Sequence, residues 1–125
     1  MTTWESGRES SLLDDIIAGR KTIEGRLNKG KFSNYAVGDR VSLRRDVRNA
    51  EGKLEDGEPD AAQVEIVAIR PYASFLELVT KEGYKKVIPS ARSAEDAAAE
   101  YNKYYSLEEQ NLYGVLAIEV KLLEN

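Results

Sequence analysis

The feature that most constrains the fold is a helix-start pattern that recurs four times between short alternating segments. In this pattern an acid follows a serine by three residues, so the serine hydroxyl can cap a free backbone N–H while the acidic side chain bonds back to the serine. The first two predicted helices end at Gly19 and Gly83, and glycine commonly terminates helices. The fourth is short enough to be a single turn. The four capping serines are Ser11, Ser74, Ser93 and Ser106.

Apolar and polar residues alternate between these predicted helices, as they do in strands that bury one face. The order is helix, strand, strand, a polar segment, strand, helices and strand. It predicts an α+β fold in which helices plug a small curled sheet or barrel. The predicted strands are residues 22–27 and 39–45, which alternate, residues 63–72, which have apolar side chains on both faces, and residues 113–123, a long, well-buried strand.

The chain contains no repeat and no linker that would divide it, so residues 1–125 are expected to form a single domain. A hydrophobic content of 42% is enough to build one buried core. Residues 1–10 are interpreted as an N-terminal arm. Residues 46–62 are polar and follow neither the helix period nor the strand period, which predicts a long polar hairpin loop.

The absence of cysteine and histidine excludes several kinds of chemistry. Disulfides, thiolate metal sites and cysteine nucleophiles cannot form, and the usual general base at neutral pH and the commonest metal ligand are missing. Catalysis would have to use Lys, Glu, Asp, Tyr, Ser or Thr, and neither a metal nor another cofactor is expected. No run approaches the roughly 18 apolar residues of a membrane span. The first residues lack a basic and apolar leader, so we expect a cytoplasmic protein without a membrane partner.

Charge is distributed unevenly along the chain, whose formal net charge is −4. Residues 1–50 contain ten basic and seven acidic side chains, a net of +3, whereas residues 51–125 contain eight and fifteen, a net of −7. The overall acidity argues against a general polyanion binder. The first half can still form a local basic face, although solvated surface charge is the simpler explanation for most of its members. These are Arg20, Lys21, Arg26, Lys29, Lys31, Arg40, Arg44 and Arg45.

The densest charged segment is AGRKTIEGRL, residues 18–27, where the first predicted helix passes into the first predicted strand. Gly19 would allow a sharp turn and the close approach of another molecule to the backbone. The strand period of two puts Glu24 and Arg26 on one face, where the arginine can pair with the carboxylate or with ligand oxygens. Lys21 reaches the same side only if it belongs to the turn. The residues alone leave open a surface ion-pair ladder, worth about 0 to 1 kcal/mol per pair.

The spacing Gly-x-Lys-x-x-Glu-x-Arg after a first helix resembles the signature of the ASCH domain, a small β-barrel similar to the PUA RNA-binding domain. The segments YAVGDRVSL, YASFLEL, PSARSAEDAAAEYNKYYS and YGVLAIEV resemble further parts of that family, so the resemblance covers about residues 11–121. It implies a PUA-like barrel of about five to six mixed strands with flanking helices. It also implies a cleft lined by Lys21, Glu24 and Arg26 that takes RNA or a modified nucleoside.

Branches of this family differ in activity. One bacterial branch is similar to a compact amidohydrolase that acts on N4-acetylcytidine. It has a lysine at the position of Lys21, a threonine at that of Glu24, and a distant glutamate that aligns near Ser90. Two of these three positions therefore differ in this chain. Other branches are linked to RNA binding and to RNA cleavage.

The residues of the motif suit different tasks. Arg26 and Lys21 suit a phosphate or a carbonyl oxygen, because arginine makes bidentate contacts and lysine is a point charge. Glu24 can accept a hydrogen bond from a nucleobase amine or act as a base, but nearby cations would lower its pKa and weaken it as a proton acceptor. Lys21 would need burial or like-charged neighbours to lose its proton. Ser90 either presents its hydroxyl to the cleft or is a simple turn residue.

Aromatic side chains near the motif could stack on a base, as they do in proteins that bind single-stranded RNA. Tyr35, in a loop after the motif, is the favoured cleft aromatic. Core packing is expected for Phe75, Tyr101, Tyr105 and Tyr113.

The sequence thus predicts a monomeric binding module that captures RNA or a modified nucleoside in a cleft. The alternative is a metal-independent hydrolase, a nucleoside amidohydrolase or a ribonuclease, with Lys21, Glu24 and Ser90 as catalytic residues. A pocket that shields Lys21 from solvent would favour catalysis, whereas an open groove with basic flanks would favour polymer binding. A third hypothesis, that the acidic 51–62 segment binds a protein, has little support in the sequence. The predicted ligand-binding residues are Gly19, Lys21, Glu24, Arg26, Tyr35 and Ser90.

Overall fold

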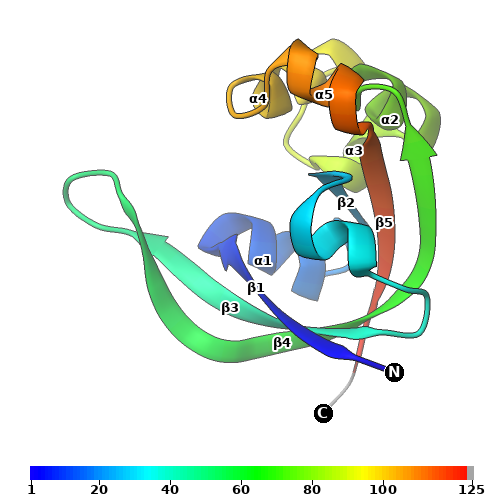
Figure 1. Ribbon diagram of the computed structural model, residues 1–125. Coiled ribbons are helices and arrows are strands. Elements are labelled where there is room, and N and C mark those ends of the chain that lie inside the picture. The colour runs from blue at the N-terminus through cyan, green and yellow to red at the C-terminus, as the bar shows by residue number, and fades with distance from the viewer. Residues whose placement is uncertain (124–125) are drawn as a thin grey trace.

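A curved five-stranded sheet organises the computed structural model, which describes residues 1–123 (Figure 1). The strand order is β1-β3-β4-β5-β2, so β1 and β2 are the two outer strands. β1 runs parallel to β3, and the other neighbouring pairs are antiparallel. The sheet curls into a half-barrel, which confirms the predicted α+β class. The strands are β1 (Thr3–Glu9), β2 (Ile23–Leu27), β3 (Arg40–Arg48), β4 (Leu54–Tyr72) and β5 (Val115–Leu122).

The helices occupy two places relative to the sheet. α1 lies in the hollow of the half-barrel, whereas α2 to α5 gather at one end of it (Figure 1). Within the described chain, no helix combines the length and the apolar character needed to cross a membrane. The helices are α1 (Ser10–Ile17), the 3-10 helix η1 (Gly30–Asn34), α2 (Phe75–Glu82), α3 (Tyr84–Val87), α4 (Ala94–Asn102) and α5 (Leu107–Tyr113).

Three of the four predicted serine caps are confirmed. Ser74, Ser93 and Ser106 each accept a hydrogen bond from the backbone N–H three residues on. Ser106 and Glu109 form a full capping box, and α5 continues well beyond the single turn that the sequence predicted. The prediction for Ser11 is wrong, because α1 already begins at Ser10 and the Ser11 hydroxyl donates to the Glu9 carboxylate instead.

Two apolar cores lie on opposite faces of β5. Leu116, Ile118 and Val120 pack inside the half-barrel with the buried face of α1, while Val115 and Ala117 pack against the helices at its end. This follows from the strand period of two, which sends successive side chains to opposite faces. Among the described strands β2 pairs with β5 alone, whose two faces carry the two cores, so the segment that carries the Lys-Glu-Arg motif lies beside both.

Residues 1–10 do not form an arm. Residues 3–9 are the strand β1, which pairs in parallel with β3 along its whole length, from Thr3 opposite Arg40 to Glu9 opposite Asp46. The side chains of β1 that are buried are polar, Ser6 and Arg8, so the strand carries no apolar alternation that would mark it in the sequence.

Residues 46–62 are paired strand rather than a long loop. β3 runs on to Arg48 and β4 begins at Leu54, so residues 49–53 alone form the turn. The side-chain oxygen of Asn49 accepts from the backbone N–H groups of Glu51 and Lys53 and fixes this turn. The hairpin projects away from the body of the protein (Figure 1), and most of its side chains are exposed on both faces. Apolar and polar residues therefore do not alternate along this hairpin, although its backbone is paired.

Candidate functional site

Three charged residues of the 18–27 segment, Lys21, Glu24 and Arg26, meet on one side of β2. The strand places Glu24 beside Arg26, whose Nη2 lies 3.4 Å from Oε2 of Glu24. Gly19 has a φ of 81°, which favours glycine, and it belongs to the turn between α1 and β2. Lys21 lies before the first residue of β2, and its Nζ is 3.7 Å from Oε1 of Glu24. The three side chains that the sequence proposed therefore lie together.

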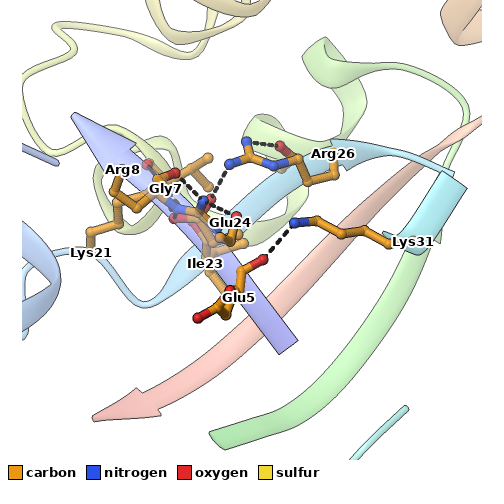
Figure 2. Close-up of polar contacts among 11 residues, drawn as sticks. Glu5, Gly7, Arg8, Lys21, Ile23, Glu24, Arg26 and Lys31 are labelled. Carbon is orange, nitrogen blue, oxygen red and sulfur yellow. Dashed lines mark hydrogen bonds and ion pairs between the residues drawn. The ribbon is translucent and has the colours of Figure 1, made fainter. Parts of the chain in front are cut away.

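Arg8 joins this cluster from β1 (Figure 2). Its Nε lies 2.9 Å from Oε1 of Glu24, and its Nη1 donates to Ser6 Oγ at 2.6 Å and to the carbonyl oxygen of Gly7 at 2.7 Å. The ion pair crosses the gap between the two outer strands of the sheet. Sequence reasoning missed Arg8, because its only signal is a single arginine in a polar stretch that was interpreted as an arm.

The cluster is buried and carries excess positive charge. Arg8, Lys21 and Glu24 are 5%, 3% and 5% exposed, and the Arg26 side chain is 19% exposed. Three cations thus surround one carboxylate, a formal charge of +2 when all four groups are ionised. A buried charge without a partner is unfavourable, so the arrangement attracts an anion or a strong hydrogen-bond acceptor.

Glu24 is held as a carboxylate. Burial by itself would raise the pKa of Glu24, but Arg8, Lys21 and Arg26 outweigh burial and hold that pKa well below its usual range. Glu24 is therefore a hydrogen-bond acceptor near neutral pH and a weak base, as the neighbouring cations in the sequence predicted.

Burial lowers the pKa of Lys21, with Glu24 opposing that shift and Arg8 adding to it. The ammonium group of Lys21 donates to the carbonyl oxygens of Ile23, at 2.9 Å, and of Val87. Two of the three N–H groups of the ammonium thus donate to backbone carbonyl oxygens, and these hydrogen bonds favour the charged form of the side chain.

A pocket of about 450 Å³ opens beside the cluster. Its buried part is formed by Arg8, Lys21, Glu24 and Arg26, and one side is formed by tyrosines from the C-terminal part of α4 and the residues after it. The volume lies within the range of small-molecule sites, about 300–1,000 Å³. Further lining residues include Tyr101, Tyr104, Tyr105, Ser90, Glu9, Asp96 and Glu100.

The remaining predicted site residues separate into two groups. Ser90 is exposed and lines the pocket. Gly19 and Tyr35 do not line it. Tyr35 follows η1 and packs inside the half-barrel, with its ring centroid 5.1 Å from that of Trp4 and 5.3 Å from that of Phe32.

The pocket aromatics are therefore tyrosines that the sequence assigned to the core or left unassigned. Tyr101 stacks on Phe75 with a centroid distance of 4.3 Å and an angle of 4°, so it packs in the core as predicted and also reaches the pocket. Tyr105 is partly buried against the same core, with its ring tilted by 30° and its centroid 5.3 Å from that of Phe75, and it also lines the pocket. Tyr104 is 69% exposed and is free to contact a ligand.

Three arginines of the basic face predicted for the first half of the chain are paired with neighbouring acids. Arg20 pairs with Asp15 at 2.8 Å. Arg44 pairs with Asp46 at 2.6 Å and with Asp56 at 3.2 Å. Arg45 pairs with Asp14 at 2.9 Å, and further acids belong to the pocket lining. These pairs reduce the positive field that a long polyanion would need.

Comparison with known proteins adds a family and a set of structural relatives. A family model described as the ASCH domain matches residues 10–124. The hypothetical protein PH0355 is 33% identical, with a TM-score of 0.80, over 98% of this chain and 100% of its own. Protein PF0455 from Pyrococcus furiosus is 35% identical, with a TM-score of 0.77, over 99% and 100%. An ASCH domain from Lactobacillus crispatus, 15% identical over 97% of this chain and 79% of its own, shares the fold with a TM-score of 0.62. None of the curated proteins matches.

Proposed function

This chain belongs to the ASCH domain family, a family linked to RNA binding, and we propose that it binds a nucleoside or a single nucleotide unit of RNA in the pocket beside Glu24. One observation carries the proposal. Two buried cations and the partly exposed Arg26 surround one ionised carboxylate at the buried end of a pocket of about 450 Å³, and tyrosines line one side of that pocket.

The charges of the cluster suit the edge of a nucleobase. Arg26 is the least buried of the three cations, and its guanidinium can donate to a base carbonyl oxygen or to a phosphate. Glu24, as a carboxylate, accepts from an exocyclic amine or a ring N–H. A base presents such acceptors and donors side by side, while its face can stack on an exposed aromatic such as Tyr104.

The size and surroundings of the pocket favour one nucleotide unit over a long strand. The volume is that of a small-molecule site. Outside the pocket, acids pair with Arg20, Arg44 and Arg45, which weakens any track of positive charge along the predicted basic face. Phosphate contacts along such a track supply most of the affinity of proteins that bind strands without sequence preference.

Calorimetric titration tests this proposal. The ligands are the four common nucleosides, N4-acetylcytidine, their 5′-monophosphates and a short single-stranded RNA. The wild type is compared with Arg26→Gln, which removes the accessible cation, and with Arg40→Gln, an exposed arginine on β3 outside the pocket lining, as the control. We expect Arg26→Gln to weaken binding by about tenfold or more, because a hydrogen bond to a charged group contributes about 1.5–3 kcal/mol. Equal affinities for the two variants, or no binding to any of these ligands by the folded wild type, would contradict the proposal.

A metal-independent hydrolase acting in the same pocket is the second candidate. It is favoured by the position of Lys21, which is shielded from solvent, has its pKa lowered by burial and lies beside Glu24. Incubation with N4-acetylcytidine and with single-stranded RNA, without added metal and followed by chromatography, tests it. We expect turnover to increase at alkaline pH, where more of Lys21 is neutral, and to be lost in Lys21→Arg. A folded preparation that releases no product from either substrate would exclude these two reactions and would leave the binding proposal unaffected.

A further inference from the structure

Three buried polar atoms around Glu24 have no hydrogen-bond partner among the described residues. They are Arg8 Nε, Glu24 Oε1 and the hydroxyl oxygen of Tyr35. The first two lie 2.9 Å apart, close enough for an ion pair, but their geometry does not meet that of a hydrogen bond. Buried polar groups are nearly always paired with protein or with ordered water, so three unpaired atoms in one place require a partner.

The same three residues line a small cavity inside the half-barrel. The cavity has a volume of about 10 Å³, and its other walls are aliphatic side chains from α1 and from strands β3, β4 and β5. Arg8 and Glu24 line both this cavity and the ligand pocket, whereas Tyr35 lines the cavity alone. A cavity needs roughly 10–15 Å³ and two to four polar partners to hold one water molecule. The aliphatic lining residues are Ile16, Val41, Leu43, Val64, Ile118 and Val120.

We propose that this cavity binds a single water molecule that joins Tyr35 to the Arg8–Glu24 pair. The water accepts a hydrogen bond from Arg8 Nε–H and another from the Tyr35 hydroxyl, and it donates one to Glu24 Oε1. This assignment gives each of the three unpaired atoms a partner of the correct type. Burial raises the pKa of Tyr35, so its hydroxyl keeps the proton that the assignment requires.

The water makes Tyr35 a positioning residue for Glu24. The Tyr35 ring is held by Trp4 and Phe32, and the Trp4 indole N–H is itself fixed by a hydrogen bond of 2.9 Å to Asp39. Arg8 and Lys21 already pair with Oε1 of Glu24, and through the water this rigid aromatic group adds a third hold on that oxygen, which helps keep Oε2 toward Arg26 and the pocket. This consequence for the ligand rests on the proposed function, whereas the water site itself does not.

Crystal structures that resolve ordered water test the site directly, in the wild type and in Tyr35→Phe. We expect one water within hydrogen-bonding distance of all three atoms in the wild type, and its loss or displacement in Tyr35→Phe. The Arg8 Nε–H signal in NMR spectra should shift in Tyr35→Phe and stay unchanged in Tyr113→Phe, a control on the partly exposed end of α5. A wild-type structure in which the Tyr35 hydroxyl bonds Glu24 or Arg8 directly, with no water between them, would overturn the proposal even if the variant failed to fold.

Nucleoside titration tests the positioning role separately. We expect Tyr35→Phe to weaken binding by about fivefold, which corresponds to one hydrogen bond of about 1 kcal/mol, and Tyr113→Phe to leave it unchanged. An ordered water together with equal affinity in Tyr35→Phe would keep the water site and overturn the positioning role. If the wild type binds no ligand, the proposed function fails and the positioning role fails with it, while the crystal structure still decides the water site.

Discussion

Arg8 Nε and Glu24 Oε1 lie 2.9 Å apart across the gap between β1 and β2, the two outer strands of the sheet. Lys31 crosses the same gap, with Nζ donating to the carbonyl oxygen of Glu5 at 2.6 Å (Figure 2). Side chains, and not a backbone ladder, therefore join the two edges of the half-barrel. Arg8 and Glu24, which line the pocket, also join the two outer strands, so changes there should affect stability as well as the proposed binding.

Replacing Arg8 by Met should destabilise the protein by about 1.5–3 kcal/mol, because it removes the ion pair with Glu24 and the bonds to Ser6 and Gly7, while Lys21 and Arg26 still compensate the carboxylate. Urea denaturation measures this loss. The double variant Arg8→Met, Glu24→Gln should lose less than the sum of the two single variants, since the two side chains interact. A loss below about 1 kcal/mol for Arg8→Met would show that the pair across the gap contributes little.

Acid should destabilise the protein in part through Glu24. The folded state holds the pKa of this carboxyl below the ordinary value of 4.5, so the unfolded chain binds more protons there as the pH falls. The stabilisation is complete above the ordinary pKa and is lost as the pH falls through that value toward the folded-state pKa. Urea midpoints measured near neutral pH and at several values below 4.5 should fall more steeply for the wild type than for Glu24→Gln. The same dependence of the urea midpoint on pH in both proteins would contradict the role of Glu24 in the loss of stability in acid.

Replacing Gly25 by Ala should disturb the wall of the pocket. A methyl group at this position would lie 2.9 Å from Cζ and from the hydroxyl oxygen of Tyr101, and 3.2 Å from Cε1 of Phe75. Such overpacking typically costs about 1–3 kcal/mol. The displaced Tyr101 ring should also narrow the pocket and weaken nucleoside binding, as thermal denaturation and calorimetry would show. In a Tyr101→Leu background, Gly25→Ala should reduce the stability of the protein by less. An equal loss of stability in both backgrounds would show that the added methyl group does not clash with Tyr101.

The serine caps provide a matched pair of stability tests. Ser93→Ala removes the hydroxyl that accepts from the Asp96 N–H at 3.0 Å and should cost about 1 kcal/mol. Ser11→Ala removes a hydroxyl that caps no helix and should change stability by less than about 0.5 kcal/mol. Urea denaturation of both variants distinguishes the two positions, and similar losses at both would mean that Ser11 caps α1 in solution.

The features that could be predicted from the sequence are those fixed by nearby residues. A serine and an acid three residues later lie within one helical turn, which is why α2, α4 and α5 could be placed from this local pattern. The meeting of Lys21, Glu24 and Arg26 depends on one turn and on the period of one strand.

The features that the sequence concealed depend on partners far along the chain. β1 buries Arg8 only because Glu24 on another strand compensates its charge, so no apolar pattern marks the strand. The β3–β4 hairpin is stabilised by backbone pairing while its side chains face solvent, which removes the alternation used to recognise strands. Tyr35 and Tyr101 are both buried next to Glu24, and only the path of the chain decides which of them reaches the pocket.

The position of β2 in the sheet has a consequence for synthesis of the protein on the ribosome. β2 forms strand pairs only with β5, which comprises residues 115–122. Glu24 and Arg26 are therefore made early but stay unassembled until that much later segment has left the ribosome. Pairing between segments so distant in sequence is intrinsically slow, because the chain between them must first be ordered. During translation the nascent chain thus carries the residues of the ligand pocket without the pocket itself.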